Sequence, residues 1–198
     1  MRTTSKGTRI FAAVATLLAG MTAAAPAAQA SEAETRPLPH CTMYISAGTV
    51  DCYATFHEAI ANATGGKVTD APSAASAMHD EVFAQRLNSL TEPDGSPKTG
   101  VARVVTSIEF QHPRYQGATF TWYQSRGCDN DTGVEYSVRN IKDHNSWWND
   151  RISSFRGYSK CQVNHYEHTG FRGARTGYRS EMSTMGVMED ETSSLRWR

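Results

Sequence analysis

The sequence predicts an all-β domain made of two similar halves, preceded by a small, disulfide-closed α-helical extension. From about residue 101 onward, β-branched and aromatic residues alternate with polar ones, and glycines and Asn/Asp clusters separate the runs. Two aromatic hairpin patterns recur in that region, and an acidic Ser-Ser segment follows each of them. Before residue 90, the sequence instead has closely spaced cysteines and short stretches with the apolar spacing of a helix.

The first thirty residues have the pattern of a secretory signal peptide. Arg2, Lys6 and Arg9 precede an apolar run, and residues 28–30 (Ala-Gln-Ala) offer small side chains at a cleavage site. The run is shorter and richer in alanine than a membrane span requires. We therefore expect residues 1–30 to be removed, which leaves a secreted, extracellular chain with no membrane insertion after cleavage.

Charge and length restrict the classes of function. Residues 31–198 carry 17 basic and 20 acidic residues, and no run of Lys or Arg stands out. Nucleic acid is therefore not an expected partner. The length suits one domain of ordinary size with an appendage.

Four cysteines remain after the signal peptide, and an even number in an exported chain predicts two disulfides. Three connectivities are possible. We favour Cys41–Cys52 with Cys128–Cys161, because each of the two regions of the chain then holds one pair. The absence of a CxxC spacing argues against metal binding by cysteine.

An N-terminal extension is expected over residues 31–90, with one short hairpin over 41–52 and two helices. Thr55 and Glu58 have the spacing of a capping box, which predicts a first helix over 56–63. The Gly-Gly pair at 65–66 is expected to end it, since glycine readily adopts the left-handed conformation found after a helix.

The second helix is predicted over residues 74–89, with one apolar stripe. The stripe would contain Met78, Val82, Phe83 and Leu87. Residues 91–105 have the Pro, Gly and Ser content of a linker, and residues 106–198 would form the β domain.

Two constellations repeat within the β domain. FQHPRYQG (110–117) and YEHTGFRG (166–173) share an aromatic, four residues, an aromatic, one residue and a glycine. The aromatics can pack across a folded turn, and the glycine permits a backbone angle that a Cβ would resist. Each hairpin precedes a Ser-Ser segment, NDRISS (149–154) or EDETSS (189–194). The common order is a stronger signal than either pattern alone.

This order resembles the βγ-crystallin superfamily, whose domains contain two Greek-key motifs, each with such a hairpin. The resemblance implies a two-motif Greek-key β-sandwich over residues 106–198. The N-terminal extension looks like one found on secreted actinobacterial proteins of this type, and a streptomycete metalloproteinase inhibitor has a related fold. Residues expected in one shared core are Phe110, Tyr115, Phe120, Tyr166, Phe171 and Trp197.

Microbial calcium-binding members of that superfamily carry Asn/Asp-Asn/Asp-x-x-Ser/Thr-Ser in each motif, which the two Ser-Ser segments resemble. The resemblance implies one or two calcium ions, with each segment contributing to both sites. Such ions take carboxylate, carbonyl and hydroxyl oxygens. The alternative is an arch that hydrogen-bonds its own backbone without an ion, and Glu189 departs from the pattern. The implied ligands are the side chains of Asp150, Ser153, Asp190 and Ser193 and the carbonyls of Arg151 and Glu191.

The expected function is a non-catalytic, calcium-stabilised module that binds an unknown protein, cell surface or polymer. The alternative is an extracellular peptidase inhibitor directed at a secreted metalloproteinase. Enzymatic signatures are missing: His57-Glu58 begins an HExxH pattern, but Ala61 occupies the position of the second ligand. The sequence also has no GxSxG elbow and no P-loop.

Overall fold

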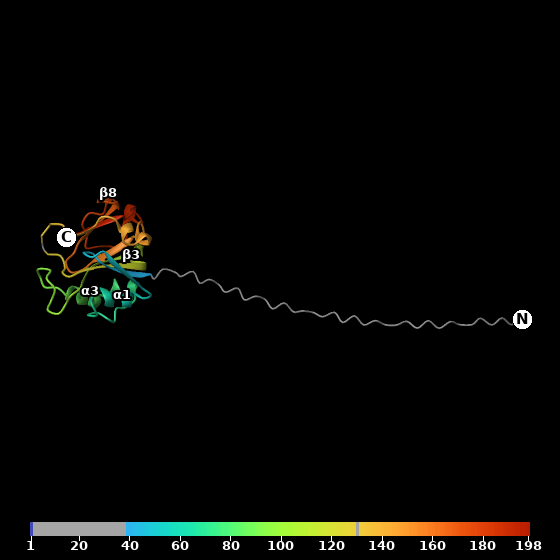
Figure 1. Cartoon of the computed structure of the whole chain (residues 1–198), viewed down its shortest axis with the longest axis horizontal. Coiled ribbons are helices and arrows are strands. Elements are labelled where there is room, and N and C mark those ends of the chain that lie inside the picture. Colours follow the sequence, from blue (N-terminus) through green and yellow to red (C-terminus); the bar gives the residue numbers. More distant parts are fainter. Residues whose placement is uncertain (2–38, 130) are drawn as a thin grey trace. The chain divides into compact units, whose positions relative to one another are not determined.

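The computed structural model describes residue 1, residues 39–129 and residues 131–198, and within these residues ten strands form two sheets (Figure 1). The predicted signal peptide lies outside the described part of the chain. The six-stranded sheet has the order β2-β1-β4-β3-β6-β9, and the four-stranded sheet has the order β5-β10-β7-β8. All strand pairs are antiparallel except β1 with β4, which run parallel.

The strands are short, as expected for a domain with many turns. The six-stranded sheet contains β1 (His40–Tyr44), β2 (Thr49–Tyr53), β3 (Val104–His112), β4 (Gln116–Gln124), β6 (Ser154–Gly157) and β9 (Glu181–Met182). The four-stranded sheet contains β5 (Tyr136–Val138), β7 (Val163–His168), β8 (Arg172–Arg175) and β10 (Ser194–Trp197). Four short 3-10 helices connect them: η1 (Pro113–Tyr115), η2 (Ile141–Asp143), η3 (Ser146–Trp148) and η4 (Gly186–Met188).

The six-stranded sheet is covered on both faces. Strands β3 and β4 are almost continuously buried rather than alternately buried and exposed, which is the pattern of strands that pack on two sides. Phe120 and Trp122 of β4 lie in the core between the two sheets. Val105, Ile108 and Tyr123 belong to a second core on the helical side.

Three helices form the layer over this second core (Figure 1). They are α1 (Phe56–Ala63), α2 (Ala74–Ala77) and α3 (Glu81–Asn88). Their apolar faces bring Phe56, Ile60, Phe83 and Leu87 against the sheet. Within the described residues, none of the helices has the length and hydrophobicity needed to cross a membrane.

Helix α1 has the bounds that the capping box predicts. The Thr55 hydroxyl accepts from the backbone N–H of Glu58 at 3.2 Å, and the Glu58 carboxylate accepts from the N–H of Thr55 at 3.1 Å. Each side chain therefore satisfies one backbone donor at the start of the helix.

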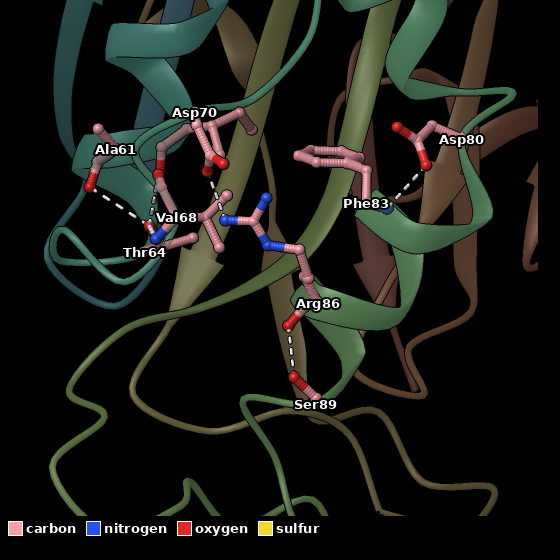
Figure 2. Close-up of polar contacts among 9 residues, drawn as sticks. Ala61, Thr64, Val68, Asp70, Asp80, Phe83, Arg86 and Ser89 are labelled. Atoms are coloured by element: carbon pink, nitrogen blue, oxygen red, sulfur yellow. Dashed lines mark hydrogen bonds and ion pairs between the residues drawn. The ribbon is translucent and has the colours of Figure 1, made fainter.

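The single helix predicted over 74–89 is wrong, because the chain forms α2 and α3 instead. The Asp80 carboxylate accepts from the N–H of Phe83 at 3.0 Å and caps α3, while Arg86 pairs with Asp70 (Figure 2). A new N-cap starts a new helix and shifts the phase of the apolar stripe. Val82 is consequently 65% exposed rather than buried, whereas Met78, Phe83 and Leu87 are buried as expected.

Both favoured disulfides, Cys41–Cys52 and Cys128–Cys161, are confirmed. The first joins the two strands of the predicted hairpin, β1 and β2, whose cysteines lie directly opposite each other. The hairpin then continues the larger sheet, because β1 pairs with β4 from His40–Thr119 to Tyr44–Tyr123. The hairpin thus shares a sheet with the strands that follow residue 100.

Strand β3 begins at Val104, inside the segment expected to be a linker. The described residues from Pro39 onward belong to one compact unit. The composition change near residue 100 therefore marks a change from helices to strands within one body.

The expected shared aromatic core is only partly present. Phe120 and Trp197 lie between the sheets, but Phe110 and Tyr115 lie in the helix-covered core. Tyr166 and Phe171 belong to neither core: Tyr166 is buried and Phe171 is half-buried at the surface. The physical reason is strand alternation, since the aromatics of both hairpins point away from the opposite sheet.

Candidate functional site

The two Ser-Ser segments lie side by side and exchange backbone hydrogen bonds. The N–H of Asp150 donates to the carbonyl of Thr192, and the N–H of Asp190 donates to the carbonyl of Ile152, each at 3.1 Å. Equivalent atoms of the two segments thus make equivalent bonds. The pairing brings together residues that are forty positions apart in the sequence.

Each aspartate contacts the serine of the other segment. The Ser193 hydroxyl donates to an oxygen of Asp150 at 2.9 Å, and the Ser153 hydroxyl donates to an oxygen of Asp190 at 2.8 Å. The aspartates are exposed, while Ser153 and Ser193 are 1% and 8% exposed. The structure therefore creates two carboxylate–hydroxyl pairs, each of which combines both segments.

The backbone conformation at the two aspartates orients their side chains. Asp150 and Asp190 have φ angles of 55° and 57°, in the left-handed region that aspartate tolerates better than most residues. Each segment follows a 3-10 helix, and the buried side chains of Trp148 (η3) and Met188 (η4) anchor it in the core between the sheets. The arches are thus held by the same core that joins the two sheets.

The second serine of each segment has a different role. The Ser154 hydroxyl donates to the carbonyl of His112 at 2.7 Å and accepts from the N–H of Tyr115 at 3.0 Å. Ser194 repeats both contacts with His168 and Phe171, at 2.7 and 3.0 Å. These fully buried hydroxyls tie each segment to the aromatic hairpin of its own half.

The chemistry available at the two pairs suits a hard cation. Each offers one carboxylate and one hydroxyl, next to backbone carbonyls, and calcium accepts all three kinds of oxygen. Within the described ranges, no three His, Cys, Asp or Glu side chains cluster closely enough to hold a metal by themselves. An ion at either pair would therefore depend on hydroxyl and carbonyl oxygens as well.

The remaining predicted ligand residues occupy equivalent places, although their side chains differ. Arg151 and Glu191 directly follow the two aspartates and are exposed. The Arg151 guanidinium carbon lies 4.7 Å from the centre of the Trp147 ring, so this cation is stacked on an aromatic face. Asn149 donates from its amide to Asp150 at 2.6 Å, while its own carbonyl oxygen is buried without a hydrogen-bond partner.

Comparison of the chain with protein-family models and with curated proteins finds no match. Several solved structures are similar to part of it. The N-terminal domain of protein S is 19% identical, with 47% of this chain and 94% of that chain covered and a TM-score of 0.35. A βγ-crystallin domain from Flavobacterium johnsoniae is 24% identical over 47% of this chain and 93% of its own, with a TM-score of 0.35. A βγ-crystallin from Ciona intestinalis is 21% identical over 47% and 99%, also with a TM-score of 0.35.

A buried polar pair between the sheets was not predicted from the sequence. Glu109 of β3 and His165 of β7 are both 0% exposed, and a Glu109 oxygen lies 3.6 Å from a ring nitrogen of His165. Ser107 donates to Glu109 at 2.8 Å and accepts from the Trp197 indole at 2.9 Å. Alternation along β3 could have signalled this, because residues 107 and 109 share a face.

Burial controls the ionisation of both groups. It raises the pKa of Glu109 well above its ordinary value and lowers the pKa of His165 to about 3. Burial therefore disfavours the charged form of both groups. Since the pair faces the closed core rather than a cleft, it carries no catalytic arrangement.

Proposed function

We propose that this chain is a secreted, non-catalytic module of the βγ-crystallin type, and that it binds calcium between its two Ser-Ser segments. One observation carries the proposal: each aspartate of one segment is paired with the buried serine of the other, in two equivalent arrangements. The second serines, Ser154 and Ser194, already supply the hydrogen bonds that hold each segment to its hairpin. The Asp–Ser pairs, whose aspartates are exposed, are therefore available for another role.

Calcium would act as a bridge between the two halves of the domain. Its ligands would come from residues near 150 and near 190, which approach each other only in the folded chain. An ion that binds only the folded state stabilises it by mass action, by about 2.7 kcal/mol at one hundred times its dissociation constant. The proposed consequence is a module whose folded state is stabilised outside the cell, where calcium is abundant.

The test compares chelator-treated protein with calcium-titrated protein by calorimetry and thermal melting. We expect heat on titration and a rise in Tm, and Asp150→Asn together with Asp190→Asn should remove most of both. Asparagine keeps the shape, the hydrogen bond from serine and a neutral oxygen ligand, but it removes the two negative charges that attract the divalent cation. Asp51→Asn, at an exposed position of β2, is the matched control and should keep the full calcium response.

Two outcomes would contradict the proposal. The absence of both heat and a Tm shift at millimolar calcium would leave the paired segments as a structural feature. Stoichiometric inhibition of a thermolysin-type proteinase at nanomolar protein would favour the inhibitor instead, because rigid inhibitors with interfaces of ordinary size reach such affinities.

A further inference from the structure

The two halves of the domain differ in how their aromatic corners are covered. The first corner, Phe110 with Tyr115, has its rings 5.5 Å apart in an edge-to-face contact, and the second corner, Tyr166 with Phe171, repeats this at 5.8 Å. The first lies beneath the helical layer, where the His79 ring also packs on Tyr115. The second belongs to neither core cluster. Within the described residues, the helices that cover the first corner therefore have no counterpart on the second.

On the second corner, arginine side chains lie against the aromatic rings. The guanidinium carbon of Arg196 lies 3.9 Å from the centre of the Phe171 ring, and that of Arg139 lies 5.7 Å from it. Arg196 is also 5.9 Å from the centre of the Tyr166 ring. Two cations therefore flank one aromatic corner, an arrangement that the electrostatics of aromatic rings favours.

Strand register places a further arginine on the same face. Arg196 of β10 is opposite Asn164 of β7, and Arg175 of β8 is opposite Tyr166, so these residues lie on the outer side of the sheet. The alternate residue Trp197 points into the core between the sheets. Because β10 and β8 are separated by one strand, Arg196 and Arg175 are roughly 10 Å apart across the sheet.

An open cavity of about 580 Å³ lies at the edge of this face. A Cβ added at Gly170 would lie 3.4 Å from a terminal nitrogen of Arg139 and 3.9 Å from the Nε of Arg172, so both guanidinium groups approach the same point. Asp143 also lines the cavity and accepts a hydrogen bond from Asn140 at 2.7 Å. Four arginines thus form what we call the arginine face: Arg139, Arg172, Arg175 and Arg196.

These arginines have no carboxylate partners in the described part of the chain. The ion pairs of lysine and arginine within 4.0 Å there involve Arg86 and Arg156, both far from this face. The Nε of Arg196 is buried without a hydrogen-bond acceptor. Guanidinium groups without carboxylate partners, two of which (Arg139 and Arg196) lie against the Phe171 ring, are well suited to external carboxylates or sulfates, which they bind through two parallel hydrogen bonds.

We propose that the arginine face binds an anionic polysaccharide. Arg175 and Arg196, about 10 Å apart across the sheet, and Arg139 and Arg172 at the cavity spread positive charge over an area that suits a polymer with repeated anionic groups. Stacking on Phe171 restricts the Arg196 side chain before binding, which lowers the entropic cost of association. Residues 31–198 carry 17 basic and 20 acidic residues with no run of Lys or Arg, so the wider surface lacks the basic excess typical of nucleic-acid-binding domains.

The experiment measures the affinity of the purified protein for polygalacturonate and for dextran sulfate, with uncharged dextran as the negative control. A chelator is present throughout, so that the result does not depend on the proposed calcium sites. We expect binding that weakens with added salt, because exposed charges are screened. The double variant Arg139→Gln/Arg196→Gln should weaken it at least tenfold. Arg103→Gln, which removes a guanidinium stacked on Tyr123 elsewhere, should change it less than twofold.

A melting curve for each variant shows whether the fold is kept. If the loss of Arg196 unfolds the protein, Arg139→Gln/Arg175→Gln serves instead, because both of these side chains are exposed. The proposal is overturned if neither charged polymer binds, if the folded double variant binds as well as the unchanged protein, or if a DNA duplex of equal charge binds more tightly than both polysaccharides.

Discussion

At the scale of single residues, the most consequential side chains are two that the sequence did not single out. Glu109 and His165 meet between the sheets, where burial raises the pKa of Glu109 and lowers that of His165. For Glu109, the unfolded chain loses a proton above about pH 4.5 that the folded chain retains, so stability falls as the pH rises. For His165, the unfolded chain gains a proton between about pH 6.5 and 3 that the folded chain does not, so stability falls as the pH falls.

Glu109→Gln should therefore raise stability relative to the unchanged protein by an amount that grows with pH. Glutamine can still accept a hydrogen bond from Ser107 but cannot ionise when the chain unfolds. The expected gain above pH 4.5 is at most about 1.4 kcal/mol per pH unit, measured by urea unfolding at several pH values between 5 and 8. Glu92→Gln, at an exposed position, is the control. A difference between variant and unchanged protein that is the same at every pH would exclude this account of Glu109.

At the scale of elements, local signals were predictable and their interruptions were not. The capping box located α1 because two side chains and two backbone donors decide it within four residues. The division between α2 and α3 depends on Asp80, whose side chain caps a new helix. The local sequence does not show which polar residue within a helical pattern will act as an N-cap. The hairpin and Ser-Ser patterns located the arches, but the contact between Asp150 and Ser193 depends on how the two halves meet.

The arches also yield a prediction that separates folding from ion binding. Ser154→Ala and Ser194→Ala should each destabilise the protein by about 1–3 kcal/mol, because each removes a hydrogen-bond partner from one carbonyl and one N–H in at least partly buried surroundings. The loss should be the same with calcium or chelator, as measured by urea unfolding. Ser153→Ala should instead reduce the calcium response. Equal calcium dependence in Ser153→Ala and Ser154→Ala would show that the two serines do not have separate roles.

At the scale of the whole molecule, the domain boundary near residue 100 illustrates what composition can and cannot reveal. The sequence pattern does change there from helical to strand-like, but the six-stranded sheet contains strands from both sides of residue 100. The first strand of the described residues, β1, pairs with β4, and the helices pack on β3 and β4 (Figure 1). Pairing between distant segments leaves no local pattern, so the sequence alone could not show that both regions share one body. The same limit applies to the arginine face, whose members come from three separate stretches.

A chain that begins at Val104 should therefore fail to form a stable monomer, although residues 104–198 contain both repeated motifs. Removing the helices bares the face of the sheet that includes Ile108, Phe110 and Tyr123. It also removes the buried Phe56, Ile60, Phe83 and Leu87, whose burial contributes roughly 6–12 kcal/mol at about 1.5–3 kcal/mol each. That sum is comparable to the entire stability of an ordinary domain, about 5–15 kcal/mol.

The measurement is size-exclusion chromatography with thermal melting of the shortened chain, and a control keeps all residues but is cut within residues 92–100. That loop joins the two regions without contributing a strand to either sheet, and the cut chain should retain its fold because β1, β2 and the helices remain packed on the larger sheet. We expect aggregation or loss of cooperative melting only for the chain that lacks residues before 104. A monomeric, cooperatively melting 104–198 fragment would mean that the core between the two sheets suffices, and that the helical layer is an addition to a domain already stable without it.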